Sequence, residues 1–200
     1  MSSLPSLRQW ALVVSRLGHP LLTTLVFVAV VAGRWLTGPA AVGAVGSVAL
    51  VVGGISLWNL RQIRRGTYGN FDVSERRHRN SFYPVLLGLL GLAAVGLFRQ
   101  PQAGGFRYGL GAAWGLLLVC YLLNFWLKVS LHAALSFFLA AAVWYLFPGW
   151  GWLALGVAGL IAASRLVLQR HSLPELLVGA ALGLAAGGGV VWGLPHLAGR

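Results

Sequence analysis

The chain of 200 residues is 58% hydrophobic and 9% charged, with a formal net charge of +12; an ordinary soluble domain has roughly 25% charged residues. A chain of this length cannot bury so much apolar surface in a water-soluble core, which excludes a soluble globular domain and a disordered chain. The Lys and Arg residues stand in short breaks between apolar runs, which excludes a nucleic-acid-binding protein of the usual kind and predicts an integral membrane protein.

Apolar runs long enough to cross the hydrocarbon core, about 20 residues each, follow one another along the chain. They predict an all-α polytopic transmembrane helix bundle of about six or seven spans, forming a single integral membrane domain over residues 1–200. The first run follows two arginines, as in a signal peptide, but an A-x-A cleavage site is absent there, so we expect this helix to be retained. The candidate spans are 19–36, 40–60, 82–98, 106–127, 130–147, 149–168 and 173–193.

Seven crossings would place the N-terminus and the breaks after spans two, four and six on one face of the membrane. Eleven of the fifteen cations fall on this face; the exceptions are Arg34, Arg99, Arg107 and Arg200. The bias predicts that this face is cytoplasmic, in what we expect to be a bacterial cell membrane. Nearly all residues capable of chemistry lie in these three breaks, and loops that meet at one end of a bundle can build one site.

In the third break, His171 and Glu175 stand four residues apart, which places them on one face of a helix. A carboxylate there can hold the Nδ1–H of the ring and raise the nucleophilicity of Nε2. The competing interpretation is a capping box, with Ser172 as N-cap and Glu175 at the third helical position. On this motif alone the cap is slightly favoured, and both can hold in part. Glycines at 179, 183 and 187 continue the same stripe and predict close packing of a neighbouring helix.

The other two breaks carry cations and histidine. Lys128 and His132 are again four residues apart; snorkelling of the lysine and a satisfied core histidine are the structural alternatives. In the first break, Arg76, Arg77 and Arg79 could neutralise a phosphate dianion through bidentate hydrogen bonds. The alternative is a solvated loop that only obeys the charge bias.

The order and spacing of the three segments resemble the type 2 phosphatidic acid phosphatase family, which also includes the vanadium-dependent haloperoxidases. The family's motifs are K-x6-R-P, P-S-G-H and S-R-x5-H-x3-D. The resemblance spans roughly Asp72 to Glu175, about half of the chain. The third motif matches as Ser164-Arg165, His171 and Glu175, with Glu in place of Asp. The second is Val129-Ser130-Leu131-His132. In the first, Arg79 takes the arginine position, Asn80 replaces the proline, and Asp72 falls where the lysine is expected.

The resemblance implies a phosphatase-like core that hydrolyses a lipid phosphate or polyprenyl diphosphate through a phosphohistidine, without metal or other cofactor. His171 would be the nucleophile, Glu175 its orienting partner and His132 the general acid. Phosphate oxygens would be bound by Arg79, Arg165, Ser130 and Ser164, with Arg76 or Lys128 in place of the missing lysine. The expected partners are the lipid phosphate substrate and membrane lipids, with no nucleic acid.

The sequence leaves three other functions open, two of which it disfavours. A catalytically degenerate scaffold or anionic-lipid-binding protein is suggested by the altered first motif. A small transporter is disfavoured because no paired inverted repeats and no mid-span acid are evident. A metal hydrolase using His78, His132 and His171 is disfavoured because the chain has three acids and no local metal-ligand spacing.

Overall fold

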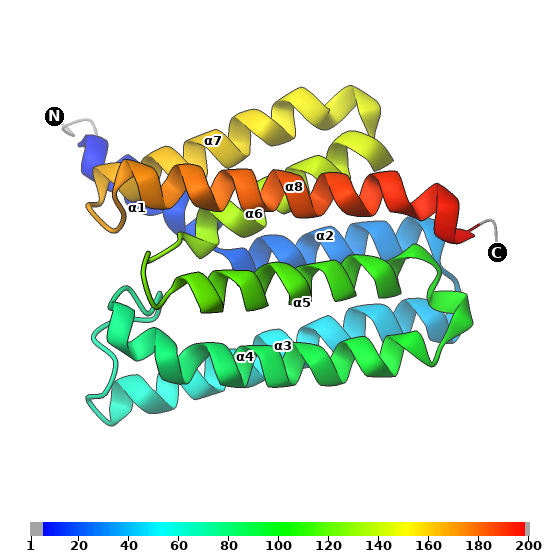
Figure 1. Cartoon of the computed structure of the whole chain (residues 1–200), viewed down its shortest axis with the longest axis horizontal. Coiled ribbons are helices and arrows are strands. Elements are labelled where there is room, and N and C mark those ends of the chain that lie inside the picture. The colour runs from blue at the N-terminus through cyan, green and yellow to red at the C-terminus, as the bar shows by residue number, and fades with distance from the viewer. Residues whose placement is uncertain (1–5, 199–200) are drawn as a thin grey trace, which may run out of the picture.

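The computed structural model describes residues 6–198, and its helices run side by side along one long axis (Figure 1). Short 3₁₀ turns, η1 (Pro101–Ala103) and η2 (Pro148–Trp150), occur in two of the connections. The α-helices are α1 (Leu7–Leu17), α2 (Pro20–Trp35), α3 (Gly38–Arg64), α4 (Arg76–Phe98), α5 (Gly105–Leu123), α6 (Leu131–Leu146), α7 (Gly151–Val167) and α8 (Leu173–Ala198).

Each of the seven predicted apolar runs forms a helix, so the prediction of an all-α membrane bundle is confirmed. By length and composition, five helices of the described chain can cross a membrane: α3, α4, α5, α7 together with η2, and α8. The pair α1 and α2, bent by 47° at its break, counts as a sixth if it forms one span. The seventh run forms α6, whose 16 residues fall short of the length of a full span. The described residues therefore favour the lower end of the predicted count.

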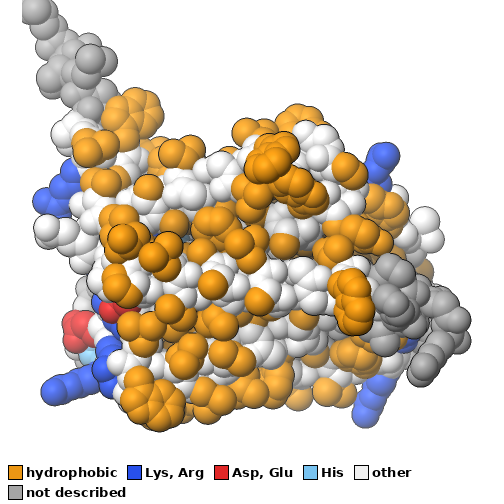
Figure 2. Space-filling model, turned by 45° about the horizontal axis from the view of Figure 1, so that its top comes forward, with side chains coloured by type: hydrophobic (Ala, Val, Ile, Leu, Met, Phe, Trp, Pro, Cys, Tyr) orange, Lys and Arg blue, Asp and Glu red, His pale blue; other side chains and the backbone are white. Residues whose placement is uncertain are grey.

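The three polar breaks meet at one end of the bundle. The connections α3–α4, α5–α6 and α7–α8 all lie at the end where α1 stands, on the left of Figure 1. Apolar side chains cover the flank of the molecule, while charged side chains gather toward its two ends (Figure 2). Arg200, which was counted on the opposite face, lies outside the described residues.

The glycine stripe of α8 packs against α6. A Cβ at Gly179 would stand 2.8 Å from the carbonyl oxygen of Ser130, and one at Gly183 would collide with the carbonyl of Ala134. Because the two backbones approach so closely, the Ser130 N–H donates to the carbonyl of Glu175 at 3.1 Å. The stripe thus brings the second and third motifs together.

A Schellman turn ends α7 and sets the spacing of the third motif. The Arg170 N–H donates to the carbonyl of Arg165, and the Gln169 N–H donates to that of Leu166, each at 2.9 Å. Gln169 adopts a left-handed φ of 54° at the position where glycine is usual. This turn reverses the chain within a few residues, so that Arg165 and His171 both remain at the polar end of the bundle.

Candidate functional site

His171 and Glu175 form the centre of the site at the start of α8. The His171 Nδ1–H donates to Glu175 Oε2 at 2.8 Å, and the Ser172 backbone N–H donates to the same oxygen at 3.1 Å. The carboxylate therefore orients the ring and caps the helix at once, so both interpretations of this segment hold in part. With its proton held on Nδ1, the buried imidazole carries its lone pair on Nε2.

Arg79, on the first turn of α4, lies next to that lone pair. Its Nη2 is 3.3 Å from His171 Nε2. The side chain is 3% exposed and is fixed by two backbone carbonyls, Val73 O at 3.1 Å from Nε and Val129 O at 2.6 Å from Nη1. The guanidinium of the first segment is thus held by the second segment and directed at the histidine of the third.

Lys128 adds a second cation, next to the carboxylate of Glu175. Its Nζ lies 3.8 Å from Glu175 Oε2 and donates to the carbonyl of Arg170 at 3.0 Å. Burial lowers the pKa of this amine, while the charge of Glu175 opposes the shift. Burial, together with the charges of Arg79 and Lys128, lowers the pKa of His171 to about 3. The imidazole is therefore neutral at neutral pH, which is the form that can act as a nucleophile.

Asp72 organises a second polar cluster beside the first. Its Oδ2 accepts from Arg165 Nη1 at 2.8 Å, and its Oδ1 lies 3.4 Å from His19 Nε2. Arg165 also donates to Ser15 Oγ at 2.5 Å. Burial alone would raise the pKa of Asp72, but the hydrogen bond from His19 and the charge of Arg165 hold it well below its usual range. Asp72 is therefore ionised and neutralises part of the charge of the arginine.

His132, in the first turn of α6, faces this cluster. Its ring lies edge-on to that of His19, with centroids 5.2 Å apart. The side chain is buried, and Nε2 has no hydrogen-bond partner among the described residues. It is therefore available to donate or accept a proton.

His19, Asp72 and His132 each offer one ligand atom, and these atoms lie within 4.8 Å of one another. This is the one group in the described chain with the geometry to hold a metal ion. However, His19 Nδ1 accepts from the Leu21 N–H at 3.3 Å, which leaves the ring proton on the Nε2 that faces Asp72. Arg165 already occupies the second carboxylate oxygen. The group is therefore arranged for hydrogen bonding to a carboxylate rather than for metal ligation.

The predicted site residues divide into two sets. His171, Glu175, Arg79 and Lys128 are in direct contact, while Arg165 and His132 surround Asp72, the neighbour of Val73. Ser130 lies two residues before His132 and serves as the N-cap of α6, where its Oγ accepts from the Ala133 N–H at 3.4 Å.

The remaining candidates make other contacts. Arg76 is exposed and donates to the backbone carbonyls of Phe125 and Trp126. The Ser164 hydroxyl donates to the carbonyl of Ile161 within α7 at 2.6 Å. His78 stacks on Tyr68 with centroids 5.3 Å apart, so it does not join His132 and His171 in a metal site.

Two members of the Asp72 cluster, Ser15 and His19, did not emerge from the sequence reasoning. The signal was available, because the crossing count places the residues before the first span on the same face as the three breaks. Ser15 lies in the last turn of α1 and His19 is the N-cap of α2, and the bend between these helices directs them at Arg165 and Asp72.

In the comparison with known families, residues 121–197 match the model of the PAP2 superfamily. Comparisons with curated proteins and with solved structures give no significant match. The matched segment contains the second and third motifs and ends well beyond Glu175, and its members are generally phosphatases. This match over residues 121–197 confirms the resemblance to that superfamily that the motifs indicated.

Proposed function

We propose that this chain is a membrane-embedded phosphatase that hydrolyses a lipid phosphate or a polyprenyl diphosphate through a phosphohistidine, without a metal. The observation that carries the proposal is the arrangement around His171. Its Nδ1 is held by Glu175 at 2.8 Å, and its Nε2 faces the guanidinium of Arg79 at 3.3 Å. A phosphate bound by that guanidinium would lie within reach of the nucleophilic nitrogen.

In the first step, neutral His171 attacks phosphorus through Nε2, and the bond from phosphorus to the leaving oxygen breaks. Arg79 and Lys128 balance the charge on the equatorial oxygens. Protonated His132 donates its proton to the leaving alkoxide. Glu175 stabilises the positive charge that develops on the attacking imidazole.

In the second step, water attacks the phosphohistidine. His132, now neutral, takes a proton from the water, the bond from phosphorus to Nε2 breaks, and His171 is restored. The product is inorganic phosphate in the case of a monoester. The charge bias of the loops supports a site on the cytoplasmic face, where it would meet substrates in the inner leaflet.

The decisive experiment is phosphate release from lipid phosphates by purified protein in detergent containing a chelator. The His171→Ala variant should lose activity, and His78→Ala should keep it, because His78 lies on the same face but stacks on Tyr68. Intact mass measurement at alkaline pH should detect a phosphoryl adduct on wild type and not on His171→Ala. Full turnover by His171→Ala would refute the mechanism.

A non-catalytic protein that binds anionic lipid is the second candidate, because Asp72 already occupies Arg165 at 2.8 Å. Such a protein would bind vanadate or anionic vesicles yet form no phosphoryl adduct and release no phosphate from any lipid phosphate tested. Trapping of the adduct therefore separates the two functions.

A further inference from the structure

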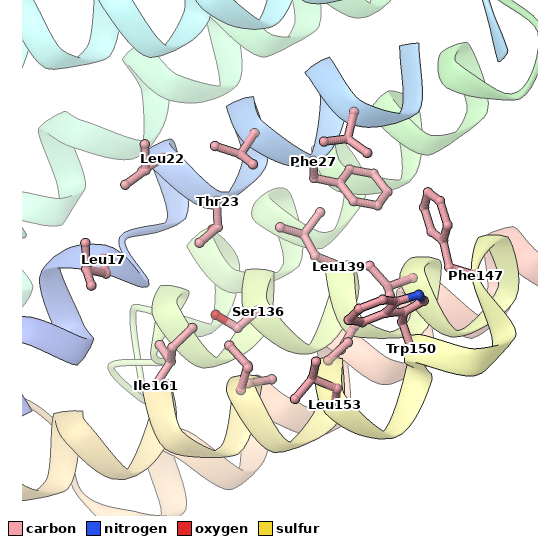
Figure 3. Close-up of a pocket in the computed structure, with 17 residues that line it drawn as sticks. Leu17, Leu22, Thr23, Phe27, Ser136, Leu139, Phe147, Trp150, Leu153 and Ile161 are labelled. Carbon is pink, nitrogen blue, oxygen red and sulfur yellow. The ribbon is translucent and has the colours of Figure 1, made fainter. Parts of the chain in front are cut away.

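An apolar groove of about 620 Å³ runs between α2, α6 and α7, and its volume is in the range of small-molecule sites. In Figure 3, Leu17 and Ile161 stand at one end, and Phe147 and Trp150 stand at the other. Several lining residues are exposed, among them Val26 at 53% and Leu153 at 58%. The groove therefore opens sideways along the flank that faces lipid.

The groove begins where the polar cluster ends. Each of its three helices contributes a cluster residue, and a lining residue follows one helical turn further from the loops. On α6, Ser136 follows His132 by four residues, and on α7, Ile161 precedes Arg165 by four. Thr23 stands in the same relation to His19, the N-cap of α2. A molecule seated in the groove would have one end beside these histidines and Arg165.

The depth of the groove matches one leaflet. Lining residues run from Leu22 to Val30 on α2 and from Ile161 to Leu153 on α7, which is eight residue steps on each helix and about 12 Å at a rise of ~1.5 Å per residue. Half of the hydrocarbon core is about 15 Å. Phe147 and Trp150 stand at the far end of the groove. The groove is therefore long enough for a hydrocarbon chain of one leaflet but too short for a partner's transmembrane helix, which would cross the whole hydrocarbon core.

We propose that this groove holds a hydrocarbon chain of the substrate, which enters laterally from the leaflet on the side of the site. The inference rests on the proposed function and specifies it: the substrate is a phosphate ester whose chain lies along α2, α6 and α7 while its phosphate reaches the histidines. Ser136 and Thr23 are polar lining residues close to the cluster, and the deeper lining is apolar. Because the chain passes from lipid into the groove rather than out of water, its binding there depends on shape and van der Waals contact with the lining side chains.

Ala154 gives a way to fill the groove. It lines the groove on α7 and is only partly buried, so Ala154→Phe places a ring in the groove without overfilling a packed core. Gly156→Phe is the matched control, because Gly156 is exposed on the same helix, does not line the groove, and has no atom within 4 Å of an added Cβ. The thermal unfolding midpoint of each variant shows whether the protein remains folded.

The experiment uses two sets of probes in lipid nanodiscs. An alkyl phosphate with a diazirine in the middle of its chain reports where the chain lies, through photo-adducts mapped by mass spectrometry. Butyl and decyl phosphate report how kcat/KM depends on chain length. We expect adducts on lining residues of the three helices, and at least a tenfold fall in the decyl-to-butyl ratio of kcat/KM for Ala154→Phe. Gly156→Phe should retain both the adducts and the ratio.

Adducts on other helices, adducts unchanged in Ala154→Phe, or a dimer cross-linked through this flank would overturn the inference. Failure of the proposed function has a different signature: adducts form in the groove, but wild type releases no phosphate from any probe. Conversely, hydrolysis that is independent of chain length and gives no groove adducts would refute the groove and leave the phosphatase intact.

Discussion

The Glu175→Gln variant tests whether the carboxylate acts on the reaction or only caps a helix. Glutamine keeps the length of the side chain and an oxygen that can accept from His171 Nδ1 and from the Ser172 N–H, but it removes the negative charge. A hydrogen bond to a charged group contributes about 1.5 kcal/mol more than a neutral one, which corresponds to roughly tenfold in rate. We therefore expect kcat to fall by about tenfold, with the thermal unfolding midpoint little changed.

The assay is phosphate release from a lipid phosphate at several substrate concentrations, with thermal unfolding measured on the same preparations. Glu75→Gln is the matched control, because it removes the same charge from the N-cap of α4, where Glu75 lies 3.6 Å from His78 and makes no contact with His171. An unchanged kcat in Glu175→Gln, or a loss of activity explained by unfolding, would show that Glu175 serves as a cap alone.

Three other variants address the charges and the turn of the site. Asp72→Asn should lower the free energy of unfolding by about 3 kcal/mol, because Arg165 stays buried without its counter-charge. The same variant should bind vanadate more tightly, because Asp72 no longer competes with the anion for Arg165. Weaker vanadate binding would contradict this competition. Lys128→Met should raise the pKa of His171 from about 3 toward 6.5, as measured by NMR of the imidazole nitrogens. Because this pKa is lower in the folded state than in the unfolded state, the wild-type protein should lose stability as the pH falls below about 6.5. The variant should lose less stability over the same pH range. Gln169→Gly should stabilise the protein by about 0.5–1 kcal/mol in thermal or chemical unfolding, because glycine adopts the left-handed φ of 54° without strain; a destabilised variant would show that the glutamine side chain is needed.

The fold could be predicted from the sequence because the solvent of a membrane protein imposes one simple rule. Each apolar run had to form a helix to satisfy its backbone in lipid, and the breaks alternate between the two ends of the bundle. The glycine stripe of α8 also predicted that a neighbouring helix packs closely, since small residues at four-residue spacing permit backbone contact; the structure identifies that helix as α6. The bend after Leu17 and the shortness of α6 were missed, because hydropathy does not register the local signals at these breaks: Pro20 at the first position of α2, the Ser130 N-cap and Pro148 after α6.

The site was predictable only where its residues are close together in the sequence. His171 and Glu175 are local neighbours on one helix, so their contact follows from spacing alone. The contact between Arg79 and His171 spans 92 positions and depends on carbonyls of Val73 and Val129, which no side-chain pattern reveals. His19 was overlooked because its role depends on a helix start that directs its ring at Asp72.

The position of Asp72 gives the altered first motif a physical meaning. Where the resemblance leads one to expect a lysine, the chain has an anion that pairs with Arg165 at 2.8 Å and is met by His19 from the opposite side. In the proposed mechanism, the positive charge that meets the phosphate is therefore concentrated on Arg79 and Lys128, which both contact the His171–Glu175 pair. Val73, next to Asp72, adopts a φ of 47° that is rare for a β-branched residue, while its carbonyl fixes Arg79. The dipeptide Asp72-Val73 thus holds both arginines, Arg165 through the carboxylate of Asp72 and Arg79 through the carbonyl of Val73. A substitution at Asp72 should therefore change both phosphate binding and the position of Arg79 beside His171.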